Sequence, residues 1–377
     1  MIYKTFQNEK LSLLGMGAMR LPVIDGNDAV IDEATAQRMV DEAVAGGVNY
    51  FDTAWGYHNG QSELFMGKAL KKYPRDSFYL ATKFPGYDLS NFGKHQEIFA
   101  EQLKKCQVDY FDFYLCHNVC EMNIDAYLNE EKYHTVSFLK QQKANGKIRH
   151  LGFSAHGSYE TIKRFLEAYG ADMEFCQLQI NWLDWEFQNA KAKVELLKEY
   201  KIPVWVMEPL RGGKLANLSD AYAQKLRALR PEEEIPAWSF RFLQSVPEVT
   251  MVLSGMSNEA QMLDNIKTFA ESKPLNAEEQ AALLEIAKEM TSQTSVPCTA
   301  CRYCTTHCPQ GLNIPYLLEL YNEHTFTKDF AFIAPMALQA LPEDKRPSAC
   351  LGCRSCERVC PQQIKISEIL ADFASMM

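Results

Sequence analysis

Two runs of cysteines near the end of the 377-residue chain have the composition and spacing of a metal or cluster site. Each run reads Cys-x2-Cys-x2-Cys-x3-Cys-Pro, first from Cys298 to Pro309 and again from Cys350 to Pro361, and together they hold eight of the twelve cysteines. Three thiolates at this spacing can surround one face of an iron–sulfur cubane, whereas the fourth precedes a proline that turns the chain away. The pattern therefore predicts two [4Fe-4S] clusters.

Zinc is the alternative to iron and sulfide, because Cys-x2-Cys pairs also occur in zinc ribbons. A zinc ion takes four ligands and gives no role to the third cysteine and the trailing proline that both runs share. This difference favours iron–sulfur clusters. The remaining cysteines have no metal-like spacing, and we expect buried, inert thiols at Cys106, Cys116, Cys120 and Cys176.

The ligand spacing resembles that of the two-cluster bacterial ferredoxins, in which the fourth cysteine of each run binds the cluster of the other run. The resemblance implies a first cluster bound by Cys298, Cys301, Cys304 and Cys360. It implies a second cluster bound by Cys350, Cys353, Cys356 and Cys308.

A second group of ionisable residues follows short apolar runs earlier in the chain. Asp52 and Tyr57 follow one run, Lys83 closes the next, and His117 closes the one after that. A lone lysine or histidine at such a position is usually a solvated loop residue or a satisfied core donor. Because the carboxyl ends of barrel strands meet at one face, ionisable groups after three consecutive strands indicate an active site.

The elements that carry these residues alternate between apolar runs and amphipathic helical segments, in units of about 30 residues. Eight such units predict a (β/α)8 barrel. An open doubly wound sheet is the alternative, but no G-x-G-x-x-G motif opens the first helix. The predicted strands are Leu14–Met19, Asn49–Ala54, Phe78–Phe84, Tyr110–His117, Arg149–Ser154, Phe175–Asn181, Pro203–Pro209 and Thr250–Gly255. The helical patterns include Ala34–Ala45, Gln96–Cys106, His134–Ala144, Tyr159–Ala168 and Ala190–Tyr200.

The barrel pattern ends in a predicted helix at Asn276–Met290, which a polar segment at 291–296 follows. We therefore predict a barrel domain at residues 1–290 and a two-cluster domain at residues 291–377. The second domain resembles the α-helical ferredoxins of multi-subunit dehydrogenases and is expected to be held together largely by its clusters. Its predicted helices are Ile314–Tyr321, Phe330–Leu341 and Ile364–Phe373.

Residues 1–290 resemble the aldo-keto reductases. The motif Asp52-Thr-Ala-x-x-Tyr57, with Lys83 and His117 at the ends of the next two strands, matches that family's catalytic tetrad. The resemblance implies reduction of a carbonyl, or oxidation of the alcohol, with Tyr57 as the general acid. A free tyrosine has a pKa of about 10, and Lys83, held by Asp52, is expected to lower it. His117 would add a hydrogen bond to the carbonyl oxygen.

The same resemblance implies a site for a nicotinamide cofactor, NADP or NAD. Ser154 and Gln177 would hold the carboxamide. Arg20 and the Pro209–Lys214 loop would lie along the pyrophosphate, and Asn265 would contact the adenine. The expected cofactor-binding residues are Gly17, Arg20, Asp52, Ser154, Gln177, Pro209, Leu210, Gly212, Lys214, Ser257, Gln261 and Asn265.

Three positions depart from the family's pattern. Ala155 replaces the asparagine that usually follows the strand-5 serine, and Met207 replaces an aromatic that often stacks on nicotinamide. Gln261 stands where many members place an arginine on the ribose 2′-phosphate. The third difference removes the clearest marker for NADP over NAD.

The aromatic residues of the barrel loops have two interpretations. They either surround a substrate mouth that suits an apolar or ring-bearing carbonyl compound, or they cover the barrel top or pack against the second domain. The residues concerned are Trp55, His58, Trp182 and Trp185.

The composition excludes several classes of protein. The net charge of −9 argues against nucleic acid or an anionic membrane as a partner. No stretch reaches the roughly 18 apolar residues of a membrane span, and no signal peptide is visible. Twelve cysteines without an export signal indicate thiols kept reduced, so we expect a cytoplasmic protein. The sequence does not determine the oligomeric state.

Three functions agree with these features. The leading hypothesis is a nicotinamide-dependent oxidoreductase that acts on a small-molecule carbonyl and is linked to a two-cluster electron-transfer domain, with a possible redox protein partner. The alternatives are an electron-transfer protein whose barrel binds nicotinamide for a partner, and an ordinary reductase with purely structural clusters. A hydride carries two electrons and each cluster accepts one, so direct exchange between them is chemically awkward.

Overall fold

The computed structural model describes residues 1–292, 296–328 and 331–377. The chain divides into two compact units, Met1–Leu284 and Glu285–Met377. Leu284 and the expected limit at residue 290 both lie within helix α13 (Ala277–Ser292), so the limits 1–290 and 291–377 stay a prediction. Residues 293–295 of the predicted polar segment lie outside the described residues.

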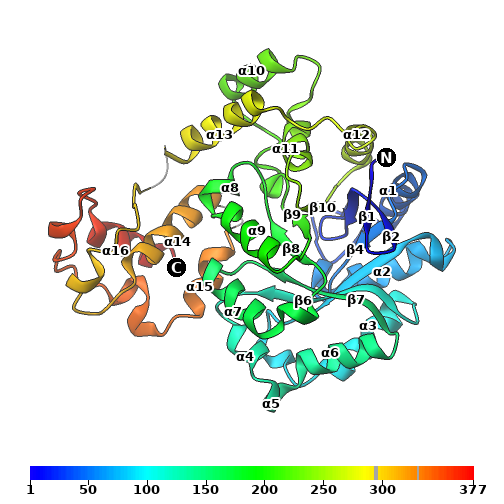
Figure 1. The fold of residues 1–377 in the computed structure, drawn as a ribbon, viewed down its shortest axis with the longest axis horizontal. Helices are drawn as coiled ribbons and strands as arrows, with labels where there is room; N and C mark the ends of the chain where they lie inside the picture. Colours follow the sequence, from blue (N-terminus) through cyan, green and yellow to red (C-terminus); the bar gives the residue numbers. More distant parts are fainter. Residues whose placement is uncertain (293–295, 329–330) are drawn as a thin grey trace. The chain divides into compact units, whose positions relative to one another are not determined.

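The first unit is a closed barrel of eight parallel strands, in the order β10-β3-β4-β5-β6-β7-β8-β9 (Figure 1). This closure confirms the predicted (β/α)8 fold over the open doubly wound sheet. The apolar runs form strands because nearly every residue in them is buried, as expected for parallel strands covered by helices. The barrel strands are β3 (Leu14–Gly17), β4 (Tyr50–Asp52), β5 (Tyr79–Phe84), β6 (Phe111–Val119), β7 (Ile148–Ala155), β8 (Cys176–Gln179), β9 (Val204–Met207) and β10 (Val249–Ser254).

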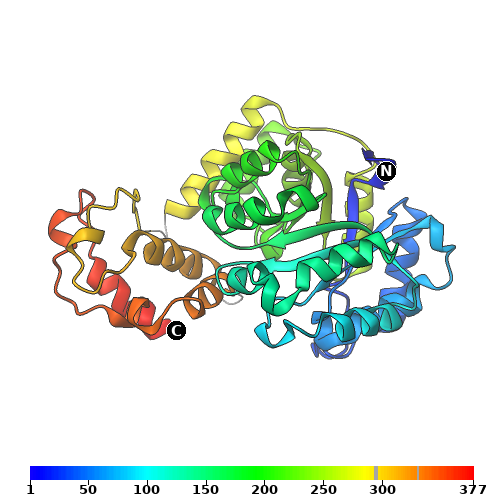
Figure 2. The ribbon, with the colours of Figure 1, turned by 60° about the horizontal axis from the view of Figure 1, so that its bottom comes forward.

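Helices surround this barrel (Figure 2). In α7 (Tyr159–Tyr169), Ile162, Phe165 and Leu166 are buried at helical spacing, and Ser158 caps the first turn. The other covering helices are α1 (Glu33–Ala45), α2 (Gln61–Leu70), α3 (His95–Cys106), α6 (Thr135–Ala144), α9 (Ala190–Glu199), α11 (Ile235–Gln244) and α12 (Glu259–Thr268). Shorter or additional helices are α4 (Ile124–Leu128), α5 (Glu130–Tyr133), α8 (Asp184–Phe187) and α10 (Asp220–Leu229).

An antiparallel hairpin precedes the barrel and was not expected from the sequence. It consists of β1 (Tyr3–Phe6) and β2 (Glu9–Ser12). Phe6 and Leu11 are buried in one cluster with side chains of the barrel interior, and the Phe6 ring lies 5.0 Å from that of Trp205. The hairpin therefore covers part of the barrel core.

The second unit contains α14 (Ile314–Thr327), α15 (Ile333–Gln339) and α16 (Ile366–Met376), close to the three predicted helices. Residue 330 of the predicted helix Phe330–Leu341 lies outside the described residues. These helices bury a core of their own, which includes Leu317, Leu338 and Phe373. The unit is therefore packed by apolar side chains as well as by its cysteine loops.

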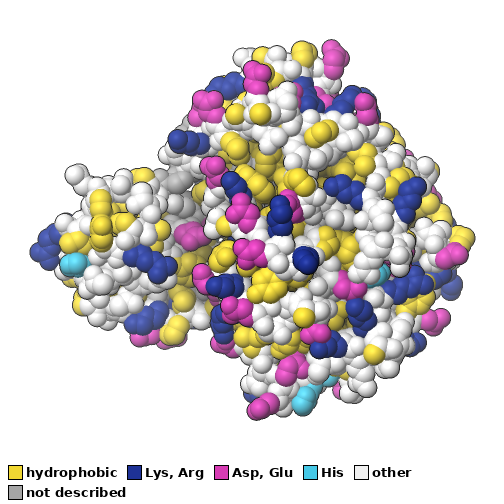
Figure 3. All heavy atoms as spheres, viewed as in Figure 1, with side chains coloured by type: hydrophobic (Ala, Val, Ile, Leu, Met, Phe, Trp, Pro, Cys, Tyr) yellow, Lys and Arg dark blue, Asp and Glu magenta, His cyan; other side chains and the backbone are white. Residues whose placement is uncertain are grey.

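Two further observations concern charge and hydropathy. On the face of the barrel drawn in Figure 3, basic and acidic side chains are interspersed. Among the described residues, no helix combines the length and apolar character needed to cross a membrane.

Candidate active site and cluster cavities

The structure brings the four predicted tetrad residues together at the carboxyl ends of β4, β5 and β6. Lys83 Nζ lies 2.6 Å from Asp52 Oδ1 and donates to the Thr53 carbonyl at 2.8 Å. Its third contact is the Tyr57 hydroxyl at 3.4 Å. The Tyr57 and His117 rings are 6.2 Å apart, edge to face. Asp52 and Lys83 are buried, whereas Tyr57 and His117 are half-buried.

Burial and charge set the protonation of these groups. Burial raises the pKa of Tyr57, and the Lys83 ammonium lowers it only in part, so the net pKa lies above the ordinary value. Lys83 therefore lowers the pKa of Tyr57 as expected, but desolvation, which the sequence does not show, is the larger effect. Burial lowers the pKa of Lys83, but Asp52 and Tyr57 outweigh this effect and the net direction is upward. Burial, Lys83 and His156 hold the pKa of His117 well below its usual range, so His117 is neutral.

Tyr87 belongs to the same site and was missed. Its ring lies 5.4 Å from the His117 ring, and a Cβ on Gly56 would lie 2.4 Å from its hydroxyl. Burial, with nearby Glu63 and Asp88, raises the pKa of Tyr87 to about 12. The only sequence signal was a tyrosine shortly after Lys83 in a Pro-Gly-Tyr turn.

The loop aromatics divide between core and surface. Trp182 is buried and donates from Nε1 to the Ser239 hydroxyl at 2.9 Å. His58 is buried, and its Nε2 accepts from the Leu21 amide at 3.1 Å. These two residues therefore do not line a substrate mouth. Trp55 and Trp185 are half-buried and stay candidates.

The residues expected along the pyrophosphate come from the ends of β3, β9 and β10. If Gly255 carried a Cβ, that atom would lie 3.3 to 3.4 Å from the Arg20 side chain. A Cβ on Gly212 would lie 3.3 Å from Arg20 Nη2. Gly212 has a left-handed backbone (φ 66), which glycine adopts without strain. Gly17 packs against the Ser254 carbonyl. Around Gly212, Pro209 is buried and Leu210 and Lys214 are half-buried.

A buried ion pair, which no sequence pattern predicted, holds the β9 loop. Arg211 Nε donates to Asp184 Oδ1 at 3.0 Å. Asn181 Nδ2 donates to Asp184 at 2.7 Å and to the Glu208 carbonyl at 3.0 Å. Burial raises the pKa of Glu208, which Arg20 opposes.

The residues expected at the two ends of the cofactor lie on β7, β8 and around α12. Ser154 and Gln177 are paired across β7 and β8, and Ser154 Oγ accepts from the Asn118 amide at 2.8 Å. The Gln177 Oε1 atom is buried without a hydrogen-bond partner, so a carboxamide N–H donor fits it. At the other end, Gln261 Oε1 accepts from the Ser257 amide at 2.8 Å. Asn265 is buried and donates to Ser254 Oγ at 3.1 Å.

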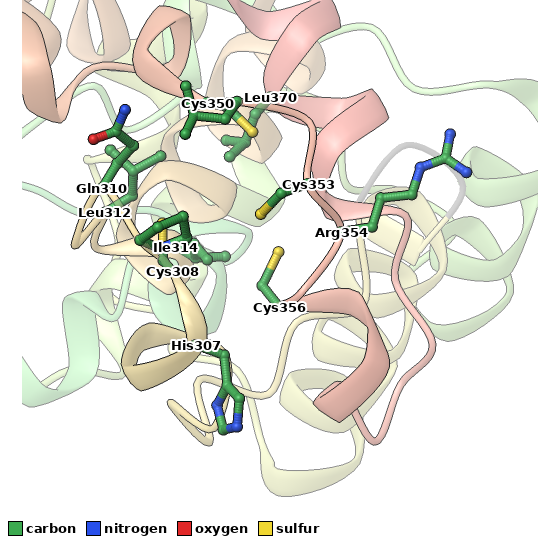
Figure 4. A pocket seen from close by; sticks show the side chains of 12 residues that line it. His307, Cys308, Gln310, Leu312, Ile314, Cys350, Cys353, Arg354, Cys356 and Leu370 are labelled. Atoms are coloured by element: carbon green, nitrogen blue, oxygen red, sulfur yellow. The ribbon is translucent and has the colours of Figure 1, made fainter.

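Two cavities in the second unit are lined by the cysteines. The first is lined by Cys298, Cys301, Cys304 and Cys360. The second, drawn in Figure 4, is lined by Cys308, Cys350, Cys353 and Cys356. Each has an empty volume of about 310 Å³, its mouth included. The structure thus groups three cysteines of one run with the fourth of the other run.

The geometry of these loops fits a cubane cluster. Arg302 (φ 65) and Arg354 (φ 59) occupy equivalent left-handed positions, and a 3-10 turn follows the third cysteine in both runs. The four sulfurs surround a cavity, as four iron corners require. No group of three or more His, Cys, Asp or Glu side chains in the described ranges converges to hold a single metal ion. Figure 4 shows Arg354 extending away from the cavity.

Comparisons with known proteins agree with both units. The model of the aldo/keto reductase family matches residues 13–288, and that of a 4Fe-4S dicluster domain matches residues 297–364. L-galactose dehydrogenase of Arabidopsis thaliana is 26% identical over 311 residues, covering 75% of this chain and 93% of its own length. The NADH-specific methylglyoxal reductase of Escherichia coli K12 is 26% identical over 302 residues, covering 68% of this chain and 89% of its own.

Other relatives are shorter matches or solved structures. Probable aldo-keto reductase 1 of Glycine max is 29% identical over 215 residues, which cover 55% of this chain and 58% of the relative. The holo form of an aldo-keto reductase from Bacillus halodurans has a TM-score of 0.62 at 26% identity, covering 76% of this chain and 96% of its own. An aldo-keto reductase from Klebsiella pneumoniae in complex with NADPH shares the fold, with a TM-score of 0.60 at 18% identity and the same two coverages.

Proposed function

Because the chain belongs to the aldo/keto reductase family, we propose that it reduces a small-molecule carbonyl, or oxidises the corresponding alcohol, with Tyr57 as the general acid. As a member of this family it is an NAD(P)-dependent oxidoreductase, and it carries a 4Fe-4S dicluster domain. The observation that carries the proposal is the buried Asp52–Lys83 pair with Lys83 Nζ 3.4 Å from the hydroxyl of the half-buried Tyr57.

The side chains have distinct roles in this chemistry. A bound NADH or NADPH supplies the hydride to the carbonyl carbon. Tyr57 is protonated at neutral pH, because tyrosine has an ordinary pKa of about 10 and burial raises the pKa of Tyr57 further, and it gives its proton to the carbonyl oxygen. Lys83 stabilises the phenolate that forms, and Asp52 keeps Lys83 charged and oriented. Neutral His117 can donate a ring N–H to the same oxygen.

NADH is the proposed cofactor in preference to NADPH. The Gln261 side chain is neutral, and its Oε1 atom already accepts a hydrogen bond from the Ser257 backbone N–H. The neighbouring Glu259 is acidic and forms an ion pair with Arg38. A 2′-phosphate with a charge near −2 therefore finds no cation from this turn, whereas a 2′-hydroxyl needs none. The Escherichia coli relative is named as NADH-specific, which supports the same preference.

The dicluster domain is proposed to transfer electrons with a redox protein partner. Cys301 and Cys353 are exposed, one at each cavity, so each cluster would have a ligand at the surface of its unit. The unit also has an apolar core, which argues against clusters that only hold the fold together. Such labile, oxygen-sensitive clusters suit a reduced cytoplasm, the location that we propose.

Anaerobic turnover tests this function. The intact protein would be mixed with NADH or NADPH and methylglyoxal, and separately with NAD⁺ and L-galactose, two probes that the names of the relatives suggest. We expect carbonyl-dependent oxidation of NADH or alcohol-dependent reduction of NAD⁺. A barrel that binds nicotinamide tightly but turns over no member of a wider panel of aldehydes, ketones and alcohols would instead favour the pure electron carrier.

A further inference from the structure

A buried polar cluster next to the candidate tetrad has no part in the proposed chemistry. Glu63, on α2, has no exposed surface. Its Oε1 atom accepts from the Thr82 hydroxyl at 2.7 Å and from Gln102 Nε2 at 2.8 Å. Its Oε2 atom lies 3.5 Å from Lys105 Nζ. A carboxylate at this depth is costly unless it is paired and hydrogen-bonded, and Glu63 has both kinds of partner.

One side of this cluster holds the strand that carries Lys83. Thr82 directly precedes Lys83 on β5, and Gln102 Nε2 donates to the Lys83 carbonyl at 2.9 Å. The Tyr114 hydroxyl in turn donates to Gln102 Oε1 at 2.6 Å and orients the amide. The end of β5 is therefore tied to Glu63 through two side chains.

The other side holds the loop that carries Tyr57. Lys105 Nζ lies 3.8 Å from the centroid of the Trp55 ring, a favourable position for a cation. Trp55 precedes Tyr57 by two residues. Helices α2 and α3 meet at Gly67, where a Cβ would lie 2.4 Å from the Lys105 carbonyl, and this close approach keeps Lys105 within reach of Glu63.

We propose that Glu63 is a positioning residue that sets the Tyr57–Lys83 contact, acting on Lys83 through Thr82 and Gln102 and on Tyr57 through Lys105 and Trp55. The contact is sensitive because its 3.4 Å length is at the outer limit of a hydrogen bond. The inference rests on the proposed function of Tyr57 and Lys83.

The test compares five variants of the full chain with clusters intact: Glu63→Gln, Lys105→Met, Trp55→Leu, the double variant Trp55→Leu/Lys105→Met, and Lys104→Met. Glu63→Gln keeps an acceptor for Thr82 and Gln102 but loses the charge that holds Lys105. Lys104→Met is the matched control, because Lys104 is the exposed neighbour on the same helix. NADH turnover with the best carbonyl probe, NADH affinity and melting temperature would be measured for each.

We expect Glu63→Gln and Lys105→Met to lower kcat about tenfold or more, as for a misplaced catalytic group, while NADH affinity and the control stay unchanged. In the Trp55→Leu background, which lacks a ring to hold the cation, Lys105→Met should cause no further loss. An unchanged kcat in both Glu63→Gln and Lys105→Met, losses that only follow the folded fraction, or fully additive losses in Trp55→Leu/Lys105→Met would overturn the inference. Tyr57→Phe, measured alongside, separates the two failures: if it is fully active, the proposed function itself is wrong.

Discussion

In the candidate active site, Lys83 Nζ lies 2.6 Å from Asp52 Oδ1 and 3.4 Å from the Tyr57 hydroxyl, so one ammonium contacts both the carboxylate and the phenol. The order of Asp52, Tyr57, Lys83 and His117 along three strands indicated the active site, because the barrel brings those strand ends together. The direction of the Tyr57 pKa did not follow from the sequence, since desolvation depends on packing that only the structure shows. Tyr87 was missed because its position depends on contacts from Gly56 and His117.

The raised pKa of Tyr57 predicts the pH dependence of carbonyl reduction. A general acid works below its pKa, so kcat/KM should stay high through neutral pH and fall only above about pH 10, the ordinary value for tyrosine. His117 is already neutral, so no loss should occur near pH 6.5, the ordinary pKa of histidine. A pH–rate profile of the intact protein measures both limits. A descending limb between pH 7 and 9 would contradict this assignment of protonation states.

The proposed preference for NADH can be tested at a single residue. Gln261→Arg introduces a guanidinium where the ribose 2′-phosphate would lie, and we expect the KM for NADPH to fall about tenfold while that for NADH changes little. Gln224→Arg, an exposed position on α10, adds the same charge elsewhere and serves as the control. Equal effects of the two variants would place the 2′-phosphate away from α12.

At the scale of elements, the strands were predictable and the hairpin was not. All eight barrel strands lie within a few residues of the apolar runs, because a strand buried on both faces is apolar throughout. The β1–β2 hairpin is short and mixes polar with apolar residues, so Phe6 and Leu11 gave too little signal. The roles of Trp182 and His58 likewise depended on which way loops turn.

Crossed ligation of the clusters is a prediction about two loops. Cys308→Ala should expose Cys350, Cys353 and Cys356 to alkylation while the cysteines at 298–304 stay protected, because thiolates bound to iron react slowly. Cys360→Ala should give the reverse pattern, so each variant is the control of the other. Peptide mass spectrometry after anaerobic alkylation distinguishes the loops. Loss of protection within the mutated run would mean that each run binds its own cluster.

The whole molecule consists of two units that each have an apolar core. Both folds were predictable from the sequence, but we expected the second unit to be held together largely by its clusters. The apolar side chains of α14, α15 and α16 form a core only when the three helices pack together. The periodicity of each helix alone does not show this packing.

Redox activity of the clusters is the prediction at this scale. Anaerobic titration of the intact protein with dithionite, followed by visible absorbance and electron paramagnetic resonance, should show reversible one-electron reduction of both clusters. Clusters that no donor reduces, in a protein with full carbonyl reductase activity, would favour the purely structural role.

The most direct test of the account compares the intact wild-type protein with Tyr57→Phe. With NADH and the best carbonyl probe under anaerobic conditions, the variant should keep its cluster absorbance and NADH affinity but turn over about 100-fold more slowly or worse, the usual loss of a general acid. Turnover by Tyr57→Phe at the wild-type rate would contradict the central claim that this barrel reduces carbonyls through Tyr57.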